Sequence, residues 1–184
     1  MAIVGISDHG GWAIFVTANA DGSIVDRRRV ELIDDDLPAL PHHHEGQSLP
    51  AEEAIALVDR VRASAERHAS LALDEVARTV PGTKGIALRA YQPLPATTAE
   101  RLRDYRARNV ADWVMYRRAL AGAAEARGWS VHFYDPKNVF ALAASVVGAR
   151  DVDAYFSGVR KIVGAPWNAD HRLAFGASLA ASGL

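Results

Sequence analysis

The chain has 184 residues, of which 49% are hydrophobic and 23% charged, and its formal net charge is −1 at pH 7. These values predict one globular domain over residues 1–184 and exclude an overall basic field, so any nucleic-acid contact needs a local basic patch. The lack of cysteine excludes disulfides and thiolate sites, and the lack of a recognisable leader or membrane-spanning run indicates a cytoplasmic, bacterial-type protein without a membrane partner.

Three short strands are expected at the start of the chain. Ala2–Ile6 and Trp12–Ala18 are apolar runs rich in β-branched residues, and Asp8-His9 followed by two glycines separates them. The sequence Asn-Ala-Asp-Gly-Ser then favours a hairpin turn. Ile24–Ile33 carries three consecutive arginines, which is typical of a half-exposed edge strand, because charges discourage pairing between edges. The chain therefore opens with a three-stranded antiparallel meander.

Two long helices and a buried strand are expected in the middle of the chain. A proline-rich polar loop leads to Ala51–Thr79, where apolar residues recur at helical spacing. The run over 84–91 reads as a buried strand. Thr97 and Glu100 then form a capping box, which predicts a second long helix that continues to Arg127.

The last third of the chain is expected to hold one strand and several helices. Residues 129–135 form the fifth strand, 138–147 form a helix, and a short helix follows. Asn168 or Asp170 opens the last helix, which runs to Ala181. Strands four and five each follow a helix, so each should lie parallel to its neighbour through a right-handed crossover. The expected fold is α/β, a mixed five-stranded sheet flanked by helices.

The first strand, Ile-Val-Gly-Ile-Ser-Asp, and the order of the elements resemble the ribonuclease H-like superfamily. That superfamily includes ribonucleases H, Holliday-junction resolvases and, by duplication, actin-like ATPases. The resemblance covers nearly the whole chain as topology and rests on two motifs, the end of the first strand and the stretch Asn168–Ala174. The segments 41–50 and 105–120 also look like a family of bacterial proteins, a likeness that implies no activity.

The resemblance implies a site where the first strand ends beside the start of the last helix. In such nucleases the central first strand ends in a carboxylate, here Asp8, and the last helix supplies further ligands, here Asp170. Asp135, after the fifth strand, is an extra candidate ligand. Carboxylates of this kind hold two Mg²⁺ or Mn²⁺ ions, which activate water and stabilise the leaving oxygen of a phosphodiester. His171 or His9 would serve as a ligand, better suited to Mn²⁺ or Zn²⁺ than to Mg²⁺, or as a proton shuttle.

One residue departs from this pattern. Resolvases place a glutamate near the end of the fourth strand, where this chain has Arg89. A guanidinium repels metal cations, so Arg89 argues against plain two-metal hydrolysis and for a phosphate clamp, or for an internal ion pair that neutralises the carboxylates. Structural roles also fit the carboxylates: Asp8 would cap the turn after its strand, and Asp170, like Asn168, is a natural helix N-cap.

Two further stretches carry functional residue types. His42–Glu45 reads His-His-His-Glu, and a loop could present two of these imidazoles to a metal, although a flexible polar loop is the commoner outcome. The predicted helix over 97–127 carries seven arginines and four acids, which is typical of a solvated face with ion pairs along it. Tyr105, Trp113 and Tyr116 among these arginines could stack on bases, but core or dimer contacts are favoured.

Three functions are compatible with these residues, and whether the chain is an enzyme stays open. The first is a divalent-metal-dependent nuclease or phosphodiesterase with a degenerate site, in which Asp8, Asp135 and Asp170 hold Mg²⁺ or Mn²⁺. Asp8, His171 and Arg89 would then take part in catalysis. The second is a non-catalytic module of the same fold that binds nucleic acid or a protein, including a second copy of the chain. The third is a nucleotide-binding single lobe.

Overall fold

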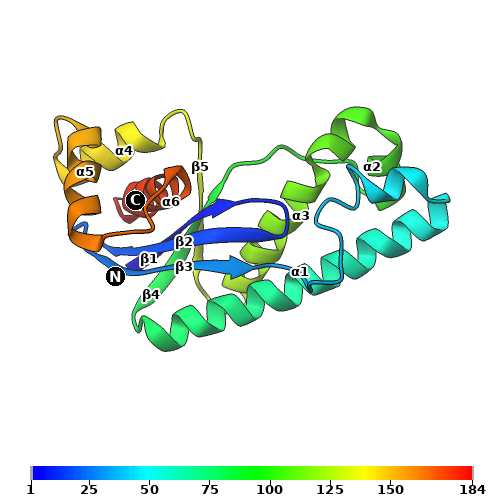
Figure 1. The fold of residues 1–184 in the computed structure, drawn as a ribbon, viewed down its shortest axis with the longest axis horizontal. Helices are drawn as coiled ribbons and strands as arrows, with labels where there is room; N and C mark the ends of the chain where they lie inside the picture. Colours follow the sequence, from blue (N-terminus) through cyan, green and yellow to red (C-terminus); the bar gives the residue numbers. More distant parts are fainter. Residues whose placement is uncertain (1, 184) are drawn as a thin grey trace.

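The computed structural model describes residues 2–183 and contains a five-stranded sheet between two helical layers (Figure 1). The strands cross the sheet in the order β3-β2-β1-β4-β5. The first three strands pair antiparallel, and β4 is parallel to both of its neighbours, as predicted. The strand bounds are β1 Ala2–Asp8, β2 Trp12–Asn19, β3 Ile24–Glu31, β4 Thr83–Arg89 and β5 Ser130–Tyr134.

The central strand β1 is buried because helices cover both of its faces. Ala2, Val4 and Ile6 point into the core on one side of the sheet, and Ile3 belongs to the core on the other side. Such a strand gives a continuous apolar run in the sequence, without the alternation of a half-exposed strand. The sequence therefore locates β1 but does not reveal which side chain faces which layer.

Two long helices cover the face of the sheet to which the even-numbered residues of β1 point. These are α1 (Ala51–Thr79), whose bounds match the prediction, and α3 (Tyr105–Glu125). Leu73 and Leu120 are completely buried in the core between these helices and the sheet. Burial of each such side chain contributes about 1.5–3 kcal/mol to stability.

The opposite face is covered by α6, with α4 and α5 packed around it (Figure 1). Their bounds are α4 Val139–Val147, α5 Val152–Val163 and α6 Ala169–Ser182. α6 lies so close to β1 that a Cβ on Gly5 would stand 1.8 Å from the carbonyl oxygen of Ala174, so this position requires glycine. The Ser178 hydroxyl donates to the carbonyl of Ile3 at 2.7 Å. The first half of β1 therefore packs directly against the backbone of α6.

The predicted single helix over 97–127 is wrong, because the chain forms two helices there. The predicted capping box begins α2 (Thr98–Arg103), and α3 follows after Asp104. The backbone of Asp104 is extended, and its carboxylate accepts hydrogen bonds from the amides of Arg106 at 2.8 Å and Ala107 at 3.0 Å. Aspartate is a strong N-cap and a poor residue inside a helix, so it starts a new helix here.

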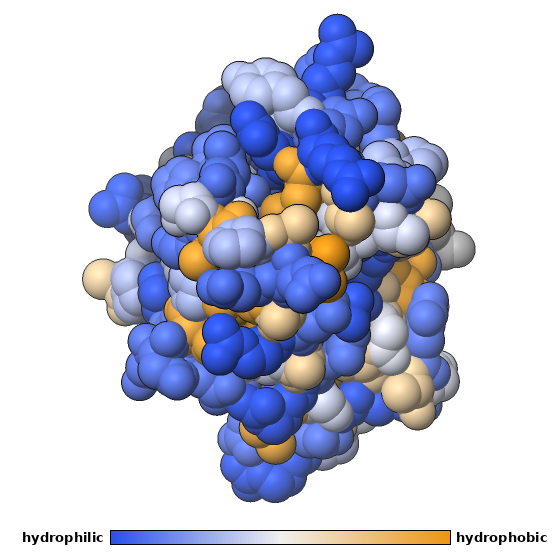
Figure 2. Space-filling model, turned by 90° about the vertical axis from the view of Figure 1, so that its right-hand side faces the viewer, coloured by the Kyte–Doolittle hydropathy of each residue, from blue (hydrophilic) through white to orange (hydrophobic). Residues whose placement is uncertain are grey.

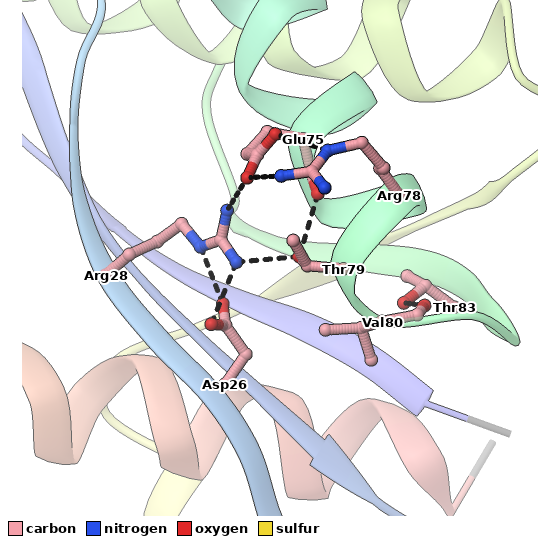
Figure 3. A network of polar contacts seen from close by, with 7 residues as sticks. All are labelled: Asp26, Arg28, Glu75, Arg78, Thr79, Val80 and Thr83. Carbon is pink, nitrogen blue, oxygen red and sulfur yellow. Dashed lines mark hydrogen bonds and ion pairs between the residues drawn. The ribbon is translucent and has the colours of Figure 1, made fainter.

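The arginines of β3 attach this edge strand to both helical layers. Arg28 donates to the Asp26 carboxylate at 2.7 and 2.8 Å and to the Thr79 hydroxyl at the end of α1 at 2.8 Å (Figure 3). Arg27 donates to the four carbonyl oxygens of residues 163–166, at the end of α5 and just after it, at 2.6 to 3.1 Å. Neighbouring strand residues point to opposite faces, so the arginine run serves both sides of the predicted edge strand.

Polar side chains cover most of the end of the molecule where α1 and α3 begin. Figure 2 shows this face as largely hydrophilic, with apolar residues in separate patches. Separate apolar patches of this kind are normal on a folded protein. None of the helices between residues 2 and 183 combines the length and the apolar character that crossing a membrane requires.

Candidate functional site

The parallel strands β1 and β4 separate at their carboxyl ends. Their pairing stops at Gly5 and Ala87, while the β4–β5 pairing continues to Tyr134. The Tyr134 hydroxyl donates to the free carbonyl of Ile6 at 2.8 Å. Burial raises the pKa of this hydroxyl, and the negative charge of Asp8 adds to the shift, so Tyr134 remains a donor. The side chains at the end of β1 can therefore contact residues of both helical layers.

Asp8 lies on the α3 side of this strand end. Its carboxylate accepts a hydrogen bond from Nε of Arg117 on α3 at 2.8 Å. The two side chains are 1% and 9% exposed, so this is a buried ion pair. Burial raises the pKa of the Asp8 carboxyl, and the Arg117 guanidinium opposes the shift. Asp8 therefore depends on Arg117 to keep its charge.

Asp170 lies on the α6 side of the same strand end. Its Oδ1 accepts hydrogen bonds from the Ser7 hydroxyl at 2.9 Å and from Nε2 of His9 at 2.8 Å. The Trp12 ring stacks on His9 with centroids 4.0 Å apart, and the Arg29 guanidinium carbon lies 3.9 Å from the Trp12 centroid. The two motifs at the chain ends thus meet through Ser7 and His9, which flank Asp8 in the sequence.

His171 and Asn168 form the cap of α6. The Asn168 side chain accepts from the backbone amide of His171 at 3.2 Å, and Nδ1 of His171 lies 2.7 Å from Asn168 Oδ1. Asn168 rather than Asp170 is therefore the N-cap residue. His171 is buried, and this burial, helped by the positive charge of Arg27, lowers the pKa of its ring. The ring is a neutral capping group at neutral pH.

Asp135 follows β5 and caps the turn before α4. Its carboxylate accepts a hydrogen bond from the amide of Lys137 at 2.9 Å, and its carbonyl accepts from the amide of Val139 at 3.0 Å. Arg89, at the end of β4, is exposed. Asp135 and Arg89 both line the cleft described below.

The three predicted ligands have different partners in the structure. Asp8 faces α3 in an ion pair, Asp170 belongs to the first turn of α6 and is held by Ser7, and Asp135 caps an exposed turn. Throughout residues 2–183, no three His, Asp or Glu side chains gather closely enough to hold a metal ion. The physical reason is strand alternation, which turns Asp8 away from the face on which α6 lies.

A cleft of about 720 Å³ opens on the α3 side, beyond the carboxyl ends of β4 and β5. Within the described part of the chain, Arg117 makes its side-chain hydrogen bond through Nε, which leaves the N–H groups of both Nη atoms for a ligand. The polar and aromatic residues that line this sheet-end cleft are Arg89, Tyr91, Gln92, Asn109, Trp113, Arg117 and Asp135.

The histidine run does not form the flexible loop that was the commoner expectation. His42 is buried, with Nδ1 2.7 Å from Oδ1 of Asp112, itself completely buried. The backbone amides of His42 and His43 each donate to this carboxylate at 3.0 Å. The run therefore clamps its loop to α3 and sets the His43 ring against Trp113, with centroids 6.4 Å apart.

The polar and aromatic residues of α3 divide between core and surface. Asp112 and Arg117 were expected on a solvated face but are buried. Asp112 is paired with His42, and Arg117 is paired with Asp8. Tyr116 is a core residue, Tyr105 is 67% exposed, and Trp113 is half-buried at the cleft. The role of Arg117 was not predicted, since no local pattern in the sequence links it to Asp8.

No protein-family model matches the chain, and no curated protein sequence matches it. Among solved structures, the chain is similar to "T. thermophilus RuvC in complex with Holliday junction substrate", with a TM-score of 0.51 and 13% identity. The match covers 98% of this chain and 91% of that one. A second structure, "Thermus thermophilus RuvC structure", has a TM-score of 0.47 and 13% identity, with coverage of 98% and 92%. The first match confirms the predicted ribonuclease H-like fold and the distant similarity to resolvases.

Proposed function

We propose that this protein is a nucleic-acid-binding module of the ribonuclease H-like fold, which binds phosphates in the sheet-end cleft and does not hydrolyse them by a two-metal mechanism. The observation that carries the proposal is the buried ion pair of Asp8 and Arg117, 2.8 Å apart. A guanidinium takes the place beside the Asp8 carboxylate that a bound cation would need.

The ion pair opposes metal binding for an energetic reason. A cation that coordinates Asp8 has to displace Arg117, whose side chain is only 9% exposed. Breaking a buried pair leaves an uncompensated charge in a poorly solvated position, at a cost of about 3–5 kcal/mol. The same arrangement favours a phosphate, because an anion adds a partner to Arg117 without removing Asp8.

The cleft has the donors that a phosphate requires. Arg89 is exposed on its rim, and the Nη groups of Arg117 are free of protein partners among the described residues. Outside the cleft lining, the Arg118 guanidinium lies 6.0 Å from the ring centroid of Tyr91 and adds positive charge nearby. Ligands of open α/β sheets commonly bind beyond the carboxyl ends of the strands, where this cleft lies. The similar RuvC structure, which is in complex with Holliday junction substrate, supports nucleic acid as the ligand class.

Fluorescence anisotropy with labelled DNA across a salt series tests the proposal. Arg89→Ala should weaken binding at every salt concentration and lower the slope of log K against log salt by about 1. Arg150→Ala removes an exposed arginine between α4 and α5, away from the cleft lining, and serves as the matched control. Equal affinities and slopes for the two variants would contradict a phosphate site in the cleft.

Metal titration separates the proposal from the nuclease that the sequence favoured. We expect Mg²⁺ and Mn²⁺ to change the melting temperature only slightly, and by the same amount in the wild type and in Asp8→Asn. We also expect no cleavage of the labelled DNA. A Mn²⁺-dependent rise in melting temperature that needs Asp8, together with cleavage that Asp8→Asn abolishes, would establish the metal-dependent nuclease instead.

A further inference from the structure

The sheet-end cleft contains aromatic rings as well as guanidinium groups. Trp113 reaches it from α3 and Tyr91 from the segment after β4, and both side chains are half-buried. The Tyr91 ring makes a T-shaped contact with Phe133, with centroids 5.5 Å apart and an interplanar angle of 89°. Contacts of this kind restrict the orientation of a ring.

Trp113 is also held in place from the protein side. The His43 ring lies 6.4 Å from it at an interplanar angle of 67°, and the amide of His43 is fixed by the buried carboxylate of Asp112. The histidine loop thereby supports one wall of the cleft. Trp113 is thus a positioned ring beside a space of about 720 Å³, which is of the right order for a nucleotide or two.

We infer that the cleft selects unpaired nucleotides, with a base against Trp113 or Tyr91 and the adjoining phosphate on Arg89 and Arg117. This inference rests on the proposed function. The bases of a duplex are covered on both faces by their neighbours, so recessed aromatic rings can stack only on bases that are single-stranded or extruded. The amides of Asn109 and Gln92, which also line the cleft, supply donors and acceptors for a base edge.

The experiment compares a labelled 12-nucleotide oligo(dT) with a labelled 12-base-pair duplex at one salt concentration. The wild type should bind the single strand at least tenfold more tightly than the duplex. Trp113→Leu should weaken single-strand binding by about tenfold to a hundredfold, since stacking on one base contributes that much. The same variant should leave duplex binding within about twofold of the wild type.

Two further variants keep the experiment decisive. Trp113→Phe retains an aromatic surface and should recover most of the single-strand affinity, which a loss of folding at this position would not allow. Tyr105→Leu removes an exposed aromatic residue of α3 outside the cleft, and its affinity should equal that of the wild type.

Failure of the inference and failure of the proposed function give different results. The inference would be overturned if the wild type bound both DNAs equally, and if Arg89→Ala weakened this binding while Trp113→Leu did not. The phosphate site would then still stand. Binding that Arg89→Ala does not change for either DNA would overturn the proposed function and the inference with it.

Discussion

The two sides of the β1 end differ in how they hold a carboxylate. On the α3 side, Asp8 and Arg117 form an ion pair whose side chains are 1% and 9% exposed. On the α6 side, Asp170 shares one oxygen between Ser7 and His9, and the His9 and Asp170 side chains are 39% and 25% exposed. Two consecutive residues of β1 thus face different surroundings: Asp8 faces a buried charge, and Ser7 faces a hydrogen-bonded group that is partly exposed to solvent. The side that a residue faces decides its chemistry more than its place in a motif does.

Removal of Arg117 should give the largest effect, because it leaves a buried carboxylate unpaired. Arg117→Met should lower the free energy of unfolding by about 3–5 kcal/mol, measured by urea denaturation at pH 7. The double variant Asp8→Asn/Arg117→Met should recover at least half of this loss, since no lone charge remains. A double variant as unstable as Arg117→Met would show that packing of the arginine stem, and not the charge, is responsible.

Removal of the Asp170 carboxylate should have a smaller effect, because its surroundings are partly hydrated. Asp170→Ala leaves the buried Ser7 hydroxyl without its acceptor and should cost about 1–3 kcal/mol of unfolding free energy. Asp170→Asn keeps an acceptor oxygen at the same position and should cost less than half as much. If Asp170→Ala destabilises the protein as strongly as Arg117→Met does, the contrast between the two sides fails.

Local patterns explain how much of the fold could be predicted from the sequence. The apolar repeat of Ala51–Thr79 gave the bounds of α1, and the order of strands and helices gave the sheet topology. The break at Asp104 was not foreseen, although aspartate is a known helix start, because the prediction rested on the capping box of Thr97 and Glu100, which marks only where the segment begins.

The candidate site was harder to predict because it depends on side-chain direction. β1 is apolar on both faces, so no alternation shows that Ser7 rather than Asp8 points toward α6. Arg117 lies 109 residues from Asp8, and no local rule links two such positions. The sequence therefore indicated that the two chain ends meet at one sheet edge, and the structure shows that Ser7 and His9 make this contact.

The smallest expected effect is a pH dependence on the α6 side. Burial lowers the pKa of His171 below its unfolded value of about 6.5, so the folded state binds fewer protons than the unfolded state in this range. The contribution of neutral His171 to stability is therefore complete above about pH 6.5 and is lost as the pH falls through the folded pKa. Its slope stays below about 1.4 kcal/mol per pH unit.

Urea denaturation of the wild type and His171→Gln between pH 8 and pH 5 measures this contribution. The glutamine cannot titrate, so the difference in unfolding free energy between the two proteins should be constant near pH 8 and shrink below about pH 6.5. Arg27, whose charge adds to the shift, gives an independent check: Arg27→Gln should make the decline smaller and end it at higher pH, because loss of the Arg27 charge raises the folded pKa of His171 toward its unfolded value. A difference that stays constant over the whole range would mean that the His171 ring is solvated, and the α6 side would then lack the buried neutral cap that distinguishes it from the ion pair beside α3.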